Sequence, residues 1–269
     1  FWLKASAQIR IRPIVLLLFF SNAILAFLMP GTYAPNPIEH TLSPIVTGAT
    51  VIAVKYDGGV LVAADTLASY GSQARYKDFV RMRPVGSYSL LGASGEMSDF
   101  QYMGKMIDEL DEEDWLSMDG CMMGPNQYAS YVGRVMYNRR SKGNPLYNQF
   151  LVVGKKGDEP PLLAFVDHQG TYFEDDYCAT GFGSYLAMPL LRNEWKPTIT
   201  KAEAEQLIIK CLKICFYRDC RAYCKYTIGC CDGTSATISP MLDLDHFWEH
   251  EAWLENRLTK NSGATADTW

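Results

Sequence analysis

The hydrophobic pattern of the chain is clearest in two adjacent apolar runs. Val51–Tyr56 and Val60–Ala64 are rich in β-branched residues, and Asp57-Gly58 separates them. An Asp-Gly pair between two such runs predicts a tight β-hairpin, because glycine adopts a positive φ without a steric clash. The second run ends in small residues followed by Asp65. We expect the rest of the fold to be organised around this hairpin.

Further apolar runs alternate with turn residues and predict additional strands. They are Phe79–Val85, Tyr88–Ala93, Phe150–Gly154, Leu162–Val166, Thr171–Phe173, Cys224–Cys231 and Thr234–Ile238. Strands packed so closely in sequence indicate antiparallel sheets with a buried side. Gly92-Ala93-Ser94-Gly95 is expected to end the second of these strands.

Helices are predicted where apolar residues recur every three or four positions. The expected helices are Phe100–Leu110 after a capping box at Ser98 and Gln101, Asn126–Arg140, Gly183–Arg192, and one that carries the stripe Ala204–Cys215 after a capping box at Thr200 and Glu203. Pro189 is expected to shorten or kink the third helix. Blocks of strands and helices in this order predict an α+β fold with helices on the faces of antiparallel sheets.

Composition narrows the possible functions. The 269 residues are 48% hydrophobic and 20% charged, which fits a globular protein with a sizeable core. The formal net charge of −5 argues against nucleic acid or anionic lipid as a partner, since both require a basic face. We expect no cofactor.

Cysteine and histidine spacing does not favour a metal site. Cys211, Cys215, Cys220 and Cys224 lack the paired C-x2-C spacing of zinc sites, and reduced, mostly buried thiols are the simpler interpretation. His246 and His250 stand four apart without the glutamate of an H-E-x-x-H motif. Surface or interface histidines are therefore favoured there.

The first 45 residues allow three interpretations. Basic residues precede the apolar run Ile14–Met29, which resembles a signal peptide but is shorter than the roughly 20 residues of a spanning helix. Alternatively, translation begins at Met29, and residues 1–28 are an artefact of the gene prediction. A membrane anchor is the third interpretation. Pro30–Pro44 is expected to be an extended arm.

Several motifs in order carry a family resemblance. They are TVIAVKYDGGVLVAAD at 50–65, LLGASGEMSDFQ at 90–101 and YRDCRAY at 217–223, with ADTLASYGSQARY at 64–76 and RRSKGNPLYN at 139–148. Together they resemble the beta-type subunits of the proteasome core particle. The last two are similar to the non-catalytic beta type-4 branch, which takes the seventh position of the beta ring. The resemblance runs from about Val46 to Ser239.

The resemblance implies a four-layer αββα sandwich of two antiparallel sheets, the N-terminal-nucleophile hydrolase fold. It also implies the mechanism of the active members. Their N-terminal threonine attacks the peptide carbonyl with its own α-amine as base. A lysine lowers the proton affinity nearby, an aspartate orients that lysine, and N–H groups of a Gly-rich segment stabilise the oxyanion.

Two central catalytic positions depart from the family pattern. The family nucleophile stands sixteen positions before the aspartate, which is Asp65 here, so its place is taken by Ala49. The family lysine stands sixteen positions after the aspartate, where this chain has Arg81. Alanine has no oxygen for attack, and arginine stays charged and cannot shuttle a proton. We therefore interpret Asp65 and Arg81 as an ion pair kept for packing.

Of four further features of the family pattern, two are retained and two are replaced. The oxyanion segment survives with Gly92 and Gly95, and the later family aspartate matches Asp219. The serine partner of that aspartate is replaced by Ala222, and the serine of the G-S-G turn by Phe182.

Two nearby threonines are possible replacement nucleophiles. Thr50 is expected to point to the opposite face of the strand, and Thr47 lies two residues, about 6.6 Å, upstream of Ala49. Neither is expected to reach the site. Because autocleavage requires a hydroxyl at residue 49, we predict an intact Gly48–Ala49 bond.

The resulting hypothesis is a non-catalytic structural subunit of the proteasome core, active in ATP- and ubiquitin-dependent degradation only as part of the complex. Its partners would be neighbouring beta subunits, the alpha ring and the opposite beta ring, and its location the cytoplasm and nucleus. We expect a beta-type domain at 46–240 between an N-terminal extension, 1–45, and a C-terminal arm, 241–269. The arm would make an interface through Phe247, Trp248, Trp253 and Leu254. The alternatives are a threonine hydrolase with a non-standard nucleophile, and a secreted or membrane-tethered globular protein.

Overall fold

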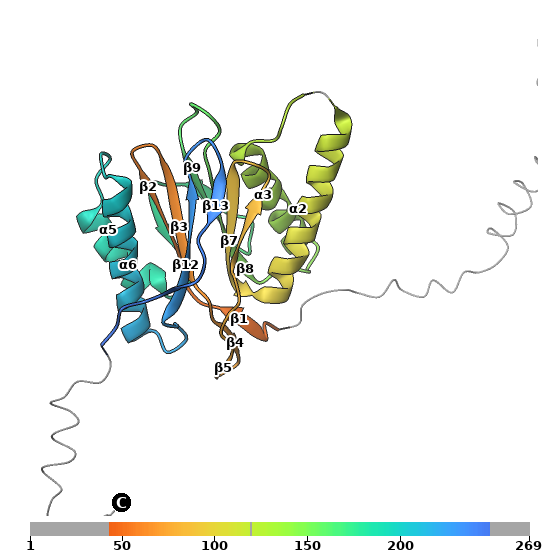
Figure 1. The fold of residues 1–269 in the computed structure, drawn as a ribbon. Helices are drawn as coiled ribbons and strands as arrows, with labels where there is room; N and C mark the ends of the chain where they lie inside the picture. The colour runs from red at the N-terminus through yellow and green to blue at the C-terminus, as the bar shows by residue number, and fades with distance from the viewer. Residues whose placement is uncertain (1–42, 119, 248–269) are drawn as a thin grey trace, which may run out of the picture. The chain divides into compact units, whose positions relative to one another are not determined.

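The computed structural model describes residues 43–118 and 120–247 and contains two stacked antiparallel sheets with helices on both outer faces (Figure 1). The four layers of the expected αββα sandwich are therefore confirmed. The expected N-terminal extension up to residue 42, His250, and Trp248, Trp253 and Leu254 lie outside the described residues. No helix in the described part of the chain combines the length and apolar character needed to cross a membrane.

The predicted hairpin forms the middle of one sheet. Strands β2 (Val51–Tyr56) and β3 (Gly59–Asp65) pair around a turn in which Gly58 has φ 114°, and β3 is buried over its whole length. The strand order of this sheet is β11-β2-β3-β12-β13, with β14 also paired to β12. The other bounds are β11, Tyr177–Ala179, β12, Lys225–Cys231, β13, Ala236–Ile238, and β14, Leu242–Asp243.

The other sheet has the strand order β10-β9-β8-β7-β1-β4-β5, and β6 also pairs with β7. Its bounds are β1, Val46–Gly48, β4, Ala68–Tyr70, β5, Gln73–Tyr76, β6, Met82–Val85, β7, Ser89–Glu96, β8, Asn148–Gly154, β9, Leu162–Val166, and β10, Tyr172–Glu174. Strands β1, β4 and β5 were not predicted. Each has only three or four residues, and β5 is exposed throughout, so no alternating pattern marks them.

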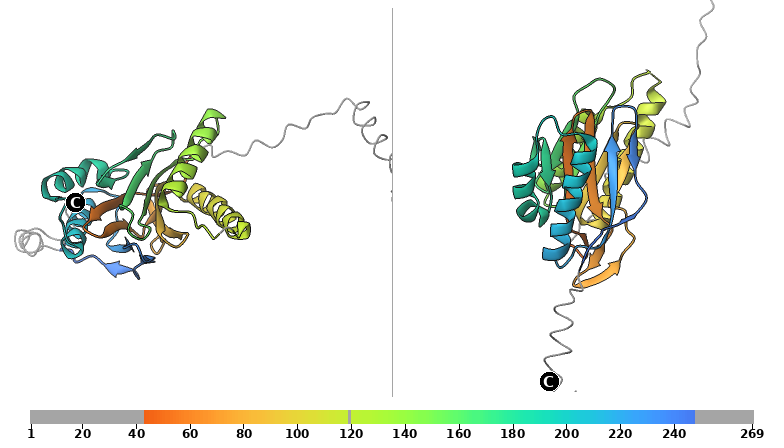
Figure 2. Two further views of the ribbon diagram at one scale, coloured as in Figure 1. Left: turned by 90° about the horizontal axis from the view of Figure 1, so that it is seen from above. Right: turned by 60° about the vertical axis from the view of Figure 1, so that its left-hand side comes forward.

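The helices form the two outer layers, as the views in Figure 2 also show. Helices α2 (Met97–Ser117) and α3 (Pro125–Ser141) cover the sheet that contains β7 and β8. Helices α4 (Gly183–Leu186), α5 (Met188–Glu194) and α6 (Lys201–Arg218) cover the sheet that contains β2 and β3. The predicted interruption near Pro189 is confirmed by the break between α4 and α5, and the Thr200–Glu203 capping box is present.

Two boundary predictions were wrong for one reason. Strand β7 does not end in the Gly-rich segment but continues through it to Glu96. Helix α2 consequently begins at Met97, and Glu96 caps it by accepting a hydrogen bond from the backbone N–H of Ser98 at 3.4 Å. The expected capping box at Ser98 and Gln101 therefore lies inside the helix.

The strand expected over Phe79–Val85 is shorter than predicted, because only its last four residues pair with β7.

Three apolar clusters hold the layers together. One lies between the sheets and includes Val51, Val62, Leu90 and Leu151. The second joins α2 and α3 to their sheet, and the third joins α4, α5 and α6 to theirs. Leu244 is 4% exposed and belongs to the third cluster, so the packed part of the chain reaches beyond residue 240.

Candidate functional site

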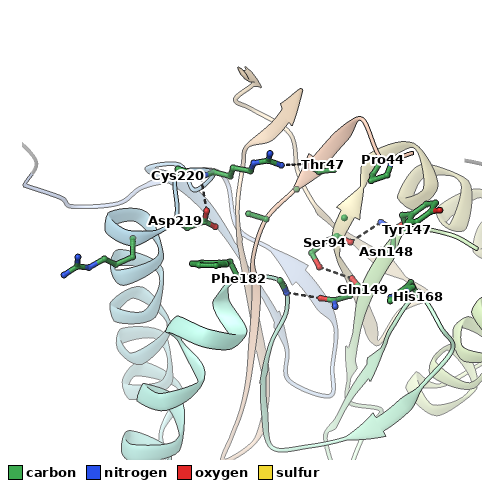
Figure 3. A pocket seen from close by; sticks show the side chains of 16 residues that line it. Pro44, Thr47, Ser94, Tyr147, Asn148, Gln149, His168, Phe182, Asp219 and Cys220 are labelled. Carbon is green, nitrogen blue, oxygen red and sulfur yellow. Dashed lines mark hydrogen bonds between the residues drawn. The ribbon is translucent and has the colours of Figure 1, made fainter. Parts of the chain in front are cut away.

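A cleft of about 660 Å³ opens where β1, β7 and β8 approach the end of α6 (Figure 3). The residues that line it are Pro44, Thr47, Gly48, Ala49, Ser94, Gly95, Tyr147, Asn148, Gln149, His168, Gly181, Phe182, Arg218, Asp219, Cys220 and Arg221. In Figure 3, Phe182, Asp219 and Cys220 lie on one side, and Tyr147 and His168 lie on the other.

Ala49 lies in this cleft because the chain changes sheets there. Strand β1 ends at Gly48 in one sheet, and β2 begins at Val51 in the other. Residues 49 and 50 cross between them, so Ala49 contributes to the cleft lining. The residue at the expected nucleophile position is thus at the cleft, and its side chain is a methyl group without a nucleophilic atom.

The two neighbouring threonines have different surroundings. Thr50 is 3% exposed, does not line the cleft, and its Oγ1 accepts a hydrogen bond from the N–H of Gly183 at 2.9 Å. Thr47 lines the cleft, and its Oγ1 accepts a hydrogen bond from Arg221 Nη1 at 3.4 Å. The expected opposite orientation of Thr50 arises from the crossing between sheets rather than from a continuous strand.

Arg81 is fully buried behind β1 and does not line the cleft. Its Nη2 forms an ion pair with Asp65 Oδ1 and donates to the carbonyl of Thr50 at 2.8 Å. Its Nε donates to the carbonyl of Asp65 at 3.0 Å. A methyl group built on Gly48 would lie 2.3 Å from Arg81 Cδ, so the side chain is packed directly against the backbone of β1. These contacts fix the guanidinium in one position.

Burial is the largest influence on the pKa of Asp65 in this ion pair. Removal of the carboxyl group from water raises the pKa of Asp65 above its ordinary value, while the Arg81 guanidinium opposes that shift and Asp219 adds to it. Within the described part of the chain, Asp65 Oδ2 and Asp219 Oδ2 are buried atoms without a hydrogen-bond partner. The carboxylate of Asp65 therefore depends on Arg81 as its counter-charge.

The Gly-rich segment contributes one of its glycines to the cleft. Gly95 lines it with φ 97°, and a Cβ there would lie 2.1 Å from the carbonyl oxygen of Tyr147. Gly95 pairs with Gly48 on one side and with Asn148 on the other. Gly92 is absent from the lining, and its missing Cβ makes room between the sheets for Val51, whose Cγ1 would be 3.0 Å away.

Of the remaining expected site residues, Phe182 and Asp219 line the cleft and Ala222 does not. Phe182 lines the cleft, is 51% exposed and meets Tyr185 edge-on with ring centroids 5.9 Å apart. Asp219 also lines it and accepts a hydrogen bond from the N–H of Arg221 at 2.9 Å. Ala222 donates its N–H to the carbonyl of Asp219 at 3.2 Å but does not line the cleft. The structure thus brings Ala49, Gly95, Phe182 and Asp219 to one cleft and keeps the Asp65–Arg81 pair behind it.

Sequence reasoning missed several lining residues. Gln149 on β8 accepts a hydrogen bond from the N–H of Gly181 at 2.9 Å and so fastens the turn that carries Phe182. His168, Cys220 and Arg221 also line the cleft. Cys220 and Arg221 directly follow Asp219 in the motif YRDCRAY. Their place in this motif is the sequence signal that could have indicated them.

The cysteines considered as metal ligands are not gathered at one point. Cys211 and Cys215 are buried on the inner face of α6, whereas Cys220 is exposed. Within residues 43–118 and 120–247, no group of three or more histidine, cysteine or acidic side chains is placed to hold a metal ion.

Comparison with known proteins identifies the family. The family described as "Proteasome subunit" matches residues 45–231. A Xenopus laevis protein named proteasome subunit beta type-4 is 43% identical over 216 residues, which cover 80% of this chain and 89% of that protein. The Arabidopsis thaliana protein of the same name is 42% identical over 82% of this chain and 89% of its own length. In Saccharomyces cerevisiae, a protein named proteasome subunit beta type-7 is 34% identical over 80% of this chain and 85% of its own length. The chain therefore belongs to the proteasome subunit family, as a beta-type member similar to the subunits named beta type-4.

Proposed function

We propose that this chain is a non-catalytic, structural subunit of the proteasome core beta ring. The observation that carries the proposal is a formed cleft lined by Ala49, the residue that the family resemblance places at the nucleophile position. Loss of a catalytic nucleophile costs on the order of 10⁶ in kcat in other hydrolases. The chain would serve protein degradation by the threonine protease complex through assembly rather than through its own chemistry.

The contacts of Arg81 support the same proposal. A lysine at this position could lose a proton, but an arginine remains charged at every relevant pH. The Arg81 guanidinium is also committed to Asp65 and to the carbonyl of Thr50. A substituted nucleophile in the cleft would therefore find no proton acceptor at this position.

Exposed apolar side chains support an assembly role. Trp115, Met118 and Met122 line one cavity at the end of α2 and are 68%, 79% and 54% exposed, respectively. Large apolar groups gathered on a surface are typical of protein contacts. We infer that the partners are neighbouring beta subunits, the alpha ring and the opposite beta ring, and that the chain acts in ubiquitin-dependent degradation in the cytoplasm and nucleus.

Native mass spectrometry of the endogenous, affinity-tagged chain tests this proposal. We expect the chain in a particle of many different subunits, and we expect the isolated full-length chain to hydrolyse no peptide. A chain recovered only as a monomer would contradict the architectural role.

The second candidate function is a threonine hydrolase with a non-standard nucleophile. Among the described residues, Thr47 is the threonine that supports it, since it lines the cleft. If Thr47 were the nucleophile, the purified chain would hydrolyse peptides and Thr47→Val would abolish that activity. Absence of hydrolysis by the unmodified chain would remove this candidate.

A further inference from the structure

The cavity at the C-terminal end of α2 has a volume of about 650 Å³ and lies where the chain turns toward α3 (Figure 1). Its lining is rich in methionine, since Met118, Met122 and Met123 contribute to it together with Trp115. Methionine side chains are flexible and polarizable, so a surface that is rich in them can adapt its packing to an apolar partner. The lining is therefore suited to receive apolar side chains of another molecule.

Hydrogen bonds to two carboxylates hold the walls of this cavity in place. Asp111 accepts one from the hydroxyl of Tyr128 at 2.5 Å and one from the N–H of Gly86 at 3.3 Å. Asp114 accepts one from the N–H of Met123 at 3.1 Å. These bonds tie α3, the turn between β6 and β7, and the loop before α3 to α2. The cavity is thus formed in the free chain, which lowers the cost of ordering its walls when a partner binds.

The charge at this end of α2 is negative. The charged residues that line the cavity are Asp111 and Asp114, and Glu112 and Glu113 stand between them with exposed side chains. Within the described helix, the last turn of α2 holds no basic residue. The C-terminal end of a helix carries a partial negative charge, so carboxylates placed there repel it. A positively charged partner would relieve this repulsion.

The elements around the cavity favour a helix as that partner. The described lining residues come from α2, α3, the turn between β6 and β7, and the loop before α3, and none of them belongs to a strand. Addition of a partner strand needs the open backbone of a strand edge, which this lining does not offer. An amphipathic helix instead presents apolar side chains at intervals of three and four residues and basic side chains beside them.

We propose that this cavity is a docking site for a basic amphipathic helix of a partner protein. Apolar side chains of the helix would enter among the methionines and Trp115, and its lysine or arginine residues would face the carboxylates of α2. The inference deepens the proposed architectural role and rests on it, because a subunit that acts through assembly needs such a contact.

Two synthetic peptides of opposite charge test the proposal on the full-length chain. Both have the same helical pattern of leucines over about 15 residues, because shorter helices are marginal in water, and the polar positions are all lysine in one and all glutamate in the other. Fluorescence anisotropy of the labelled peptides measures their affinities. We expect the lysine peptide to bind at least about tenfold more tightly than the glutamate peptide.

Variants of the chain separate the apolar contribution from the charge. Replacing Met118 and Met122 together by serine should weaken binding of the lysine peptide about tenfold. Tyr185→Ser is the matched control, because Tyr185 is 75% exposed outside the cavity, and it should leave the affinity unchanged. Replacing Glu112 and Glu113 together by glutamine should weaken the lysine peptide about fivefold without disturbing the hydrogen bonds that hold the cavity walls.

Equal affinity of the two peptides, or an unchanged affinity after replacement of the two methionines, would overturn the proposal. Native mass spectrometry of the endogenous chain tests the architectural role separately. A chain that is found in the particle but binds neither peptide would contradict the docking site alone. A chain that binds the lysine peptide but is recovered only as a monomer would contradict the architectural role alone.

Discussion

At the scale of single residues, the side chain of Ala49 brings only a methyl group to the cleft, and the buried Asp65–Arg81 ion pair lies behind it. The match of Ala49, Asp65 and Arg81 to the family's catalytic positions could be proposed from the sequence, because it depends only on their spacing along the chain. The hydrogen bond from Arg81 to the carbonyl of Thr50 joins residues 31 apart and depends on the crossing of the chain between sheets, which no local pattern encodes. The ion pair expected between Asp65 and Arg81 is present and buried.

Replacing Arg81 should strongly destabilise the fold. Arg81→Met leaves Asp65 buried without its counter-charge, and removal of one partner of a buried ion pair typically costs about 3–5 kcal/mol. We expect this loss in the free energy of unfolding of the full-length chain, measured by denaturant titration. Arg81→Lys is the matched control, since it retains the charge and should be less destabilising. Equal stability of Arg81→Met and the unmodified chain would show that the ion pair does not support the fold.

At the scale of elements, strand β7 and helix α6 were predicted with different success. The capping box and the apolar stripe of α6 are local signals, and both were confirmed. The C-terminal end of β7 was not, because Gly92 and Gly95 weaken a strand pattern. Pairing of β7 with β1, β6 and β8 overrides that local preference, and these partners are distant in sequence.

Two glycine-to-alanine substitutions should have opposite effects. Gly95→Ala places a Cβ 2.1 Å from the carbonyl of Tyr147 at φ 97°, so we expect a loss of at least about 2 kcal/mol in the free energy of unfolding. Gly133→Ala within α3 meets no atom within 4 Å and should stabilise by about 0.5–1 kcal/mol. Thermal and denaturant unfolding of the two variants measure this. A neutral Gly95→Ala would contradict the close approach of β7 to β8.

The cysteines of α6 should respond to pH. Because burial raises the pKa of Cys211 and Cys215 to about 12 from 9.0, the thiolate fraction at pH 8 falls about a thousandfold. We expect alkylation of both in the native chain to be very slow and to accelerate about tenfold per pH unit between pH 8 and 10. Above about pH 9, ionisation of these thiols in the unfolded chain should also lower stability. Mass spectrometry of alkylated peptides measures the rates, and rapid alkylation at pH 8 would place these thiols outside the core.

At the scale of the whole molecule, the sequence predicted the layered fold more accurately than the C-terminal boundary of the domain. The order of strand and helix blocks indicated the α+β class, and the family motifs indicated the four layers. The domain boundary expected at residue 240 is less sharp, since β14 pairs with β12 and Leu244 is buried. The segment that contains β14 and Leu244 has no periodic hydrophobic pattern, so its packing against the rest of the domain could not be predicted from the sequence.

Truncation after Asp245 should therefore preserve the fold and slow assembly of the double ring. Among the described residues, Leu244 is the last one that belongs to an apolar cluster, the cluster that joins α4, α5 and α6 to their sheet. The truncation removes the ring of His246, whose centroid lies 4.7 Å from that of Phe216, and the hydrogen bond from the N–H of Phe247 to Tyr217 Oη at 2.8 Å. Both interactions lie at the surface end of α6, so the core should keep its packing. Unfolding of the variant and native mass spectrometry of assembly intermediates measure the two effects.

A full-length control with serine at positions 248, 253 and 254 separates the apolar character of the tail from its length. We expect this control to assemble as slowly as the truncated chain, because apolar side chains are the groups that such an arm would bury against a partner. Assembly of the truncated chain at the normal rate would remove the proposed role of the C-terminal arm.

The most direct measurement of the central claim is the intact mass of this chain after the assembled particle reacts with a threonine-directed covalent inhibitor. The catalytic subunits of the same particle serve as the positive control. We predict that this chain gains no inhibitor mass and retains its Gly48–Ala49 bond. An inhibitor adduct on this chain, or a mature N-terminus at Ala49, would contradict a non-catalytic role.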